Sequence, residues 1–238
     1  MKAIITAAGQ SSRLWETTGR EPKTLLPFGD RSILAAILGN FAQIGIREFL
    51  IVTGYRGDLI RQHLRDHASF GMAVELLDNP EWHRGNGLSV LKALAHLAPE
   101  EPVILSMADH LVSPAALAAV RDGPAGMNLL LVDPRIGECF DLPDATKVRR
   151  EGDRIADIGK DLADYDVLDC GVFRLNQQFR SALESAVAQG REGISDGVRE
   201  LVRGPGFGTI LLPAGAAWLD IDTPESYAHA LTRRATFA

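Results

Sequence analysis

The stretch MKAIITAAGQSSRL at residues 1–14, followed by EPKTLLP at residues 21–27, governs how this chain of 238 residues begins to fold. Its apolar start at residues 2–6 predicts a short buried strand. The strand runs into residues 7–9, two alanines and a glycine, so the backbone there can approach a ligand closely. Successive free N–H groups in such a turn form a concave site for an anion. The opening therefore indicates an anion-binding loop at the end of a strand.

Two cations stand next to this loop. Arg13 carries a planar guanidinium that matches phosphate oxygens, and Lys23 carries a compact charge. Pro22 and Pro27 restrict the backbone that holds Lys23. The loop has neither the G-x-x-x-x-G-K-[ST] pattern of a P-loop nor the G-x-G-x-x-G pattern of a dinucleotide-binding turn. A polyphosphate site is one interpretation, and an ordinary strand-to-helix loop with two solvated cations is the other.

The composition is that of a globular α/β protein with one large domain. Apolar residues make up 46% of the chain and charged residues 24%, both ordinary values, and the length allows a well-buried core. The net charge of −6 argues against a nucleic-acid partner, because proteins that bind nucleic acid present a basic surface. Cys139 and Cys170 are the only cysteines, which gives no disulfide framework and indicates a reducing compartment.

Location and assembly are expected from two further features. The apolar start of the chain is too short for a signal peptide, and no stretch approaches the ~20 apolar residues that a membrane span needs. We therefore expect a cytoplasmic protein with no membrane partner. The sequence leaves a homo-oligomer open.

Strand and helix patterns alternate through the first half of the chain. This alternation predicts a mostly parallel mixed sheet with helices on both faces, a Rossmann-like arrangement whose ligands sit at the carboxyl ends of the strands. From about residue 135 the pattern changes, and we expect a smaller substrate-binding lobe there, built onto the same domain. The expected helices are 32–43, 58–66, 88–97, 114–120, 177–188, 196–202 and one from 224; the expected strands are 2–6, 48–53, 73–77, 102–107, 127–132, 146–150, 154–158, 167–175, 206–212 and 218–222.

Three aspartates stand where a metal site could form. Asp109 directly follows a predicted strand, and Asp220 and Asp222 share one face if their segment is extended. Phosphoryl chemistry on a triphosphate needs a divalent cation, usually Mg²⁺ held by a few carboxylates. The plain alternative is a turn aspartate at 109 and a helix-capping aspartate at 222, ahead of Pro224.

Two middle segments offer groups for a base and for a second substrate. The Asn86 amide suits the edge of a pyrimidine, and Gly87 lets the backbone approach a flat ring. Ser89 can cap the next helix or contact a nucleotide. Lys160 can pair with an acceptor phosphate, and Asp169 can accept hydrogen bonds from a polyol. The alternatives are a Gly/Asn turn, a solvated lysine and a turn aspartate.

The sequence A-A-G-x-x-S-R-L at residues 7–14, with Pro22-Lys23, resembles the opening of the nucleotidyltransferase superfamily that makes nucleotide-sugars and nucleotide-alcohols. The usual form, A-A-G-x-G-[ST]-R-[LFM], has a second glycine where this chain has Ser11, which narrows the allowed φ and allows a different local turn. The resemblance implies that Arg13 and Lys23 are the catalytic cations, which hold the triphosphate and stabilise charge as pyrophosphate leaves.

The segment W-x-D-x-D-T-P at residues 218–224 resembles the second metal-binding segment of the same superfamily, and Asp109 resembles the first. The implied Mg²⁺ ligands are Asp109 with Asp220 or Asp222. Under this resemblance the whole chain, 1–238, is a nucleotidyltransferase domain, with a nucleotide-binding half at 1–134 and an acceptor-binding lobe and second metal segment at 135–238. The implied nucleotide-binding set is Ala7, Ala8, Gly9, Ser11, Ser12, Arg13, Lys23, Asn86, Gly87 and Ser89.

The middle segments are similar to those of the cytidylyltransferases that activate myo-inositol 1-phosphate. They are E-W-x-R-G-N-G-x-S at 81–89, M-A-D-H-x-x-S-P at 107–114, A-T-K-V at 145–148, I-G-K-D-L at 158–162 and D-C-G-V-F at 169–173. The resemblance implies a Mg²⁺-dependent transfer from CTP to a phospho-alcohol, giving CDP-inositol and pyrophosphate, with Lys160 and Asp169 binding the acceptor.

Three other functions stay open at this point. The acceptor can instead be a sugar 1-phosphate or phosphocholine, although the acceptor segments supply few aromatic residues for a choline site. A nucleotide-sugar glycosyltransferase of similar architecture would use Asp109 but would have less need for Arg13 and Lys23. A non-catalytic module would bind the nucleotide without turnover.

Overall fold

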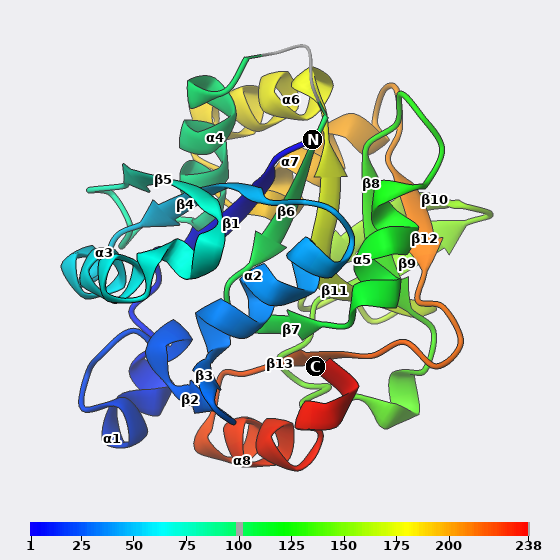
Figure 1. Cartoon of the computed structure of the whole chain (residues 1–238). Helices are drawn as coiled ribbons and strands as arrows, with labels where there is room; N and C mark the ends of the chain where they lie inside the picture. Colours follow the sequence, from blue (N-terminus) through cyan, green and yellow to red (C-terminus); the bar gives the residue numbers. More distant parts are fainter. Residues whose placement is uncertain (99–101, 238) are drawn as a thin grey trace.

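The computed structural model describes residues 1–98 and 102–237. Nine strands form one sheet with helices on both faces, and two short ribbons lie beside it (Figure 1). In spatial order the sheet strands are β5 (Ala73–Asp78), β4 (Glu48–Thr53), β1 (Ala3–Ala7), β6 (Val103–Met107), β11 (Val167–Leu175), β8 (Leu129–Asp133), β12 (Gly208–Leu211), β10 (Arg154–Gly159) and β9 (Lys147–Glu151). The ribbons pair β2 (Pro27–Phe28) with β3 (Arg31–Ser32), and β7 (His110–Val112) with β13 (Trp218–Asp220).

The helices begin and end close to the predicted bounds. Ser32 caps α2 as expected, because its hydroxyl accepts a hydrogen bond from the Ala35 N–H at 3.1 Å. Thr223 caps α8 in the same way, so Asp222 is not the capping residue. The α-helices are α1 (Trp15–Thr18), α2 (Ile33–Gln43), α3 (Gly57–Asp66), α4 (Asn86–His96), α5 (Pro114–Arg121), α6 (Gln177–Ala188), α7 (Ile194–Val202) and α8 (Pro224–Thr232).

The mostly parallel character of the sheet is confirmed. β1 pairs in parallel with both β4 and β6, and β4 with β5, so these four strands deliver their carboxyl ends to one edge. β11 runs antiparallel to its neighbours β6 and β8, and β10 runs antiparallel to β12 and β9. The expected hairpin therefore forms, as β9 and β10 at one side of the sheet.

Alternating side chains of the central strands pack into two cores. Ala3 and Ile5 of β1 belong to the core shared with α2, α3 and α5, while Ile4 between them belongs to the core shared with α4, α6 and α7. This two-sided burial explains why the first strand reads as an uninterrupted apolar run. A sheet covered on both faces is held rigidly, so the loops at its carboxyl edge start from fixed positions.

The two halves of the chain are interleaved in this sheet. β11, from the second half, lies between β6 and β8 of the first half, and β12 pairs in parallel with β8. The change of pattern near residue 135 therefore marks no break in the sheet. Figure 1 shows the N-terminal loop with α1 and the C-terminal segment with α8 at the same end of the molecule, below the strands. Within the described residues, no helix combines the length and apolarity that crossing a membrane requires.

Candidate active site

The loop after β1 keeps the left-handed turn that a glycine would favour. Ser11 has φ 53° and ψ 41°, and its carbonyl accepts a hydrogen bond from the Leu14 N–H at 3.0 Å. Ser11 thus adopts a left-handed conformation that is strained for a residue with a side chain. A short 3-10 helix, Ser12–Leu14, follows and carries Arg13.

We expect Ser11→Gly to stabilise the protein by about 0.5–1 kcal/mol. Glycine relieves the strain of the left-handed backbone, and the higher conformational entropy of glycine in the unfolded chain offsets part of this gain. The matched control is Ser12→Gly in the adjacent helical turn, which should destabilise the protein by about 0.5–1 kcal/mol because no left-handed strain is relieved there. Urea unfolding measures both changes. A Ser11→Gly protein less stable than the wild type would show that the serine hydroxyl makes a contact worth more than the strain.

This loop lines a cavity of about 300 Å³, named here the N-terminal cavity. The cavity brings together the opening of the chain, the strand end before Asp109, and the segment after β13. Its lining residues are Thr6, Ala7, Gly9, Ser11, Ser12, Arg13, Pro22, Lys23, Thr24, Ala108, Asp109 and Asp222. Most of the predicted phosphate-binding residues therefore share one cavity, as the resemblance implies.

Lys23 is a buried cation between two carboxylates. Its side chain is 10% exposed, and its ammonium lies 3.1 Å from Oδ2 of Asp109 and pairs directly with Asp222. Burial acts to lower the pKa of Lys23, but Asp109, Asp222 and Asp220 outweigh it and raise the pKa above its ordinary value. Lys23 is therefore a cation at neutral pH.

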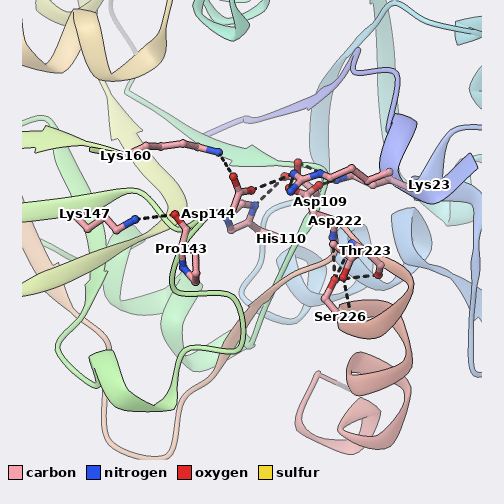
Figure 2. Close-up of polar contacts among 11 residues, drawn as sticks. Lys23, Asp109, His110, Pro143, Asp144, Lys147, Lys160, Asp222, Thr223 and Ser226 are labelled. Carbon is pink, nitrogen blue, oxygen red and sulfur yellow. Dashed lines mark hydrogen bonds and ion pairs between the residues drawn. The ribbon is translucent and has the colours of Figure 1, made fainter. Parts of the chain in front are cut away.

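Arg13 connects the two ends of the chain. One guanidinium nitrogen donates to Oδ2 of Asp222 at 2.5 Å and to Oδ2 of Asp144 at 3.0 Å. The second carboxylate oxygen of Asp144 accepts a hydrogen bond from the Lys160 ammonium at 2.7 Å. Asp222 itself is held by its backbone N–H, which donates to the Ser226 hydroxyl at 2.9 Å. Figure 2 shows this network running from Lys160 to Lys23 across the carboxyl edge of the sheet.

His110 lies next to Asp109 in the same site. Its Nδ1 lies 2.8 Å from Oδ1 of Asp109, and its ring stacks on Trp218 with centroids 5.8 Å apart. Burial disfavours the charged ring, but Asp220, Asp109 and Asp169 outweigh burial and raise the pKa of His110 to about 9. His110 is thus a third cation at neutral pH. Gly171, at φ +72°, leaves the space for this ring, since a Cβ there would lie 2.5 Å from the imidazole.

The acidic residues fit a divalent cation. Carboxylate oxygens of Asp109 and Asp220 lie within 4.8 Å of each other, and so do those of Asp144, Asp220 and Asp222. Oδ1 of Asp220 is buried and has no hydrogen-bond partner in the part of the chain that the structure describes. Burial raises the pKa of Asp220 to about 7, with Asp109 and Asp222 adding to the effect and His110 and Lys23 opposing it. Mg²⁺ prefers carboxylate oxygens as ligands, and a buried oxygen without a hydrogen-bond partner is free to bind it.

A second cavity of about 150 Å³ meets the first at Asp109 and Asp222, and is named here the central cavity. Lys160 and Asp169, both predicted for the acceptor, line it. The other lining residues are Asn86, Met107, Asp109, His110, Asp144, Thr146, Gly171, Phe173, Ile194, Ser195, Asp220 and Asp222. Ligands in the two cavities would therefore lie beside the same two carboxylates.

The buried carboxyl of Asp169 in the central cavity makes the stability of the protein depend on pH. Burial raises its pKa to about 6, although the Gly171 N–H donates to Oδ1 at 2.7 Å and His110 is nearby. In the unfolded chain the carboxyl loses its proton near pH 4. Between these values the folded state binds the extra proton, so stability contributed by Asp169 is present below pH 4 and is lost as the pH rises towards about 6.

We therefore expect Asp169→Asn, which keeps the acceptor for Gly171, to match the wild type at pH 4 and to exceed its stability at pH 7 by on the order of 2 kcal/mol. The control is Asp164→Asn, which removes a carboxylate whose side chain is 91% exposed. Urea unfolding at a series of pH values checks this. A difference that does not grow with pH would mean that Asp169 is ionised in the folded protein as easily as in water.

Three of the predicted nucleotide-binding residues lie elsewhere. Ser89 is buried within α4, where its hydroxyl accepts a hydrogen bond from Asn79, so it neither caps the helix nor lines a cavity. The Gly87 N–H donates to the carbonyl of Glu192 at 2.8 Å, and a Cβ on Gly87 would lie 2.6 Å from that carbonyl. Gly87 therefore allows close approach of the α6–α7 loop, not of a base. The carbonyl of Ala8 accepts from Tyr55, and Ala8 lines neither cavity.

Asn86 lines the central cavity, but its amide oxygen already accepts a hydrogen bond from the protein backbone. Its Oδ1 accepts a hydrogen bond from the Ile194 N–H at 3.0 Å, and the residue lines the central cavity, not the N-terminal one. Sequence reasoning assigned no role to Asp144 or to His110. Asp144 precedes the A-T-K-V segment, but its partners lie 131 and 16 residues away in the chain, so no local pattern indicates them. The signal for His110 was its position directly after Asp109.

Comparison with known proteins adds independent findings. The sequence model of the MobA-like NTP transferase domain matches residues 3–128. A bifunctional IPC transferase and DIPP synthase of Rubrobacter xylanophilus is 33% identical over 224 residues, which are 94% of this chain and 49% of that protein. The chain thus spans about half the length of this relative. A probable glucose-1-phosphate cytidylyltransferase of Bacillus subtilis is 29% identical over 142 residues, 54% of this chain and 53% of that protein.

The fold has a solved counterpart. The structure of the inositol-1-phosphate CTP transferase from T. maritima matches with a TM-score of 0.86 and 25% sequence identity, covering 99% of this chain and 95% of that one. The Rossmann-like mixed sheet expected from the alternation of strands and helices is thereby confirmed over nearly the whole chain.

Proposed function

This chain belongs to the family of MobA-like NTP transferase domains and is a nucleotidyltransferase, and from that premise we propose that it transfers a cytidylyl group from CTP to myo-inositol 1-phosphate. The observation that carries the proposal is the convergence of the two chain ends. Arg13 and Lys23 from the opening segment meet Asp222, 209 and 199 residues later, at the junction of two cavities. The name of the T. maritima relative, an inositol-1-phosphate CTP transferase, supplies the acceptor class.

In this reaction an oxygen of the acceptor phosphate attacks the α-phosphorus of CTP. A new P–O bond forms, the bond to the β-phosphate oxygen breaks in line, and its electron pair leaves with pyrophosphate. A phosphate monoester dianion is nucleophilic by itself, so the protein needs no general base for this step. Its task is to bring two polyanions together and to oppose their charge.

The two cations of the opening segment perform the second task. The N-terminal cavity would hold the triphosphate against Arg13, Lys23 and the backbone N–H groups of residues 9–12. Ion pairs with Asp109, Asp144 and Asp222 fix the positions of both cations. Pre-arranged cations of this kind need little reorganisation as charge develops on the leaving group.

Asp109, Asp220 and Asp222 are the residues that would hold Mg²⁺, since Asp220 shares a cluster of ligand atoms with each of the other two. The ion would supply additional positive charge next to the reacting phosphates. The central cavity would hold the acceptor, with Lys160 on its phosphate and Asp169 on its hydroxyl groups. The amide N–H₂ of Asn86 makes no hydrogen bond within the described residues, and Asn86 lines the same central cavity. Its proposed contact with cytosine would use this donor and would require the base to enter that cavity beside the acceptor.

The direct test is release of pyrophosphate from the four nucleoside triphosphates with Mg²⁺ and a panel of phosphorylated acceptors. We expect release with CTP and inositol 1-phosphate. No release with any triphosphate and any phospho-alcohol or phospho-sugar would refute the reaction class. A glucose 1-phosphate arm belongs in the panel, because the B. subtilis relative is named for that acceptor. Phosphocholine is the remaining acceptor alternative.

Arg13→Ala separates this reaction from the glycosyltransferase alternative. A glycosyltransferase would use a metal-bound diphosphate and would have less need for Arg13, so full turnover in Arg13→Ala would favour that class. Calorimetry that detects CTP binding without any product would favour a nucleotide-sensing module. Cytoplasmic location and oligomeric state stay predictions.

A further inference from the structure

Lys147, the first residue of β9, is a buried cation that none of the roles above uses. It is 8% exposed, and across residues 1–98 and 102–237 its ammonium has one hydrogen-bond partner, the carbonyl of Pro143 at 2.9 Å. No carboxylate within this part of the chain forms an ion pair with it. Taking an ammonium out of water is costly unless it gains an opposite charge or several acceptors. A lysine is therefore a poor choice for stability at this position.

The residue after that carbonyl is Asp144, which joins both sides of the site. Lys147 and Pro143 lie on one side of the turn in Figure 2, and Asp144 extends from the next residue to Lys160. Within this turn the Ala145 N–H also donates to the Asp141 carbonyl at 3.1 Å. The position of the Asp144 carboxylate thus depends on how firmly the Pro143 carbonyl is held.

The position of the Lys160 side chain depends on Asp144 more strongly than the position of Arg13 does. Arg13 retains Asp222 as a second carboxylate at 2.5 Å, whereas Asp144 is the one ion-pair partner of Lys160 among the residues described. The Lys160 side chain is 56% exposed, so without this partner it would sample many rotamers. Ordering such a side chain when a phosphate binds weakens the binding.

We propose that Lys147 is a positioning residue for the acceptor: it holds the Pro143 carbonyl, which places Asp144, which places Lys160 at the central cavity. The inference rests on the proposed function for the identity of the acceptor, but its structural part does not. It also explains why a cation is buried here with a single neutral partner.

The primary variant is Lys147→Met, which keeps the length of the side chain and removes the charge. We expect kcat/KM for inositol 1-phosphate to fall about tenfold, the effect of losing one hydrogen bond made by a charged group. The KM for CTP should change by less than about twofold, because Arg13 keeps Asp222, and the unfolding temperature should be unchanged or higher. Lys147→Gln, which retains a donor on a shorter side chain, should lie between the two proteins.

Lys92→Met is the matched control, since Lys92 lies in α4 and lines neither cavity. It should leave both kinetic constants and the unfolding temperature at wild-type values. A lysine with a merely structural role at 147 would give the opposite pattern to the one expected: a lower unfolding temperature, with both substrates affected to the same degree. That result overturns the proposal, and so do unchanged acceptor kinetics in Lys147→Met.

A double-mutant cycle with Asp144→Asn tests the path of the effect. If Lys147 acts through Asp144, Lys147→Met should lower acceptor kcat/KM no further in the Asp144→Asn background. Two independent, multiplying losses would contradict this path. Crystal structures of the wild type and Lys147→Met provide a readout without turnover: the proposal requires the Asp144–Lys160 pair to be lost in the variant. If the wild type turns over no substrate, the proposed function fails, while an intact pair in the variant would still overturn the positioning role by itself.

Discussion

Lys23→Met should lower turnover by about 10²–10³-fold while leaving the fold intact, the loss expected when one pre-arranged charge is removed from a reacting phosphate. Lys23 is the more buried of the two opening cations and lies between Asp109 and Asp222. Met has a similar length but no charge, so the cavity keeps its shape. Steady-state pyrophosphate release at saturating CTP measures the effect, and turnover within tenfold of the wild type would remove Lys23 from the catalytic set.

The same variant should also be less stable in the absence of divalent cations, by about 3 kcal/mol, because Asp109, Asp220 and Asp222 are then left without their shared buried cation. Mg²⁺ should raise the unfolding temperature of Lys23→Met more than that of the wild type, since it would restore the missing charge. Lys160→Met is the matched control: the exposed pair of Lys160 with Asp144 contributes less than about 1 kcal/mol. An equal Mg²⁺ effect on Lys23→Met and on the wild type would contradict the proposed metal site.

Asp220→Asn should reduce turnover by about 10³-fold and weaken the apparent affinity for Mg²⁺ or Mn²⁺ at least about tenfold. Sequence reasoning left open whether Asp220 or Asp222 is the main metal ligand, and the hydrogen bonds favour Asp220. Both oxygens of Asp222 are committed, one to Lys23 and one to Arg13, whereas Oδ1 of Asp220 has no partner in the described structure. A carboxylate with an unused buried oxygen gains the most from a cation.

Asp222→Asn is the comparison that decides between the two ligands. It should impair turnover through Arg13 and Lys23 but weaken the metal affinity less than Asp220→Asn does. Titration of turnover and of calorimetric heat with Mn²⁺ gives the two affinities. A larger loss of metal affinity in Asp222→Asn would reverse the assignment. Burial and the neighbouring carboxylates raise the pKa of Asp220 to about 7, so Asp220→Asn should in addition gain stability relative to the wild type as the pH rises from about 4, where the unfolded carboxyl ionises, to about 7.

Local signals account for the parts of the fold that were predicted well. The bounds expected for the strand at 167–175 and the helix at 177–188 coincide with β11 and α6, since an apolar run meets a polar helix start at Asn176. The placement of β11 was not predictable in this way. It is inserted between β6 and β8 by pairings across 60 or more residues on one side and about 40 on the other, and no residue pattern indicates strand order.

The glycines of the Gly85–Gly87 segment show where local reasoning about the site failed. A glycine allows close approach, but the sequence does not say of what, and here the neighbour is Glu192. Arg84 pairs with the side chain of the same glutamate, so the segment is shaped by the α6–α7 loop. The predicted contact between this segment and cytosine therefore depends on the amide of Asn86 alone.

The amino-acid sequence alone determined three features: the first strand with its loop and two cations, the alternation of strands and helices that gives a sheet covered on both faces, and the aspartates that follow strands. Each of these depends on residues that are neighbours in the chain. Tertiary structure alone decided that Asp144 links Arg13 to Lys160, that Asp220 keeps an unused buried oxygen, and that Lys147 is buried with one partner. Such contacts join segments distant in the chain, and their energies arise from burial and from opposite charges that only the completed fold brings together.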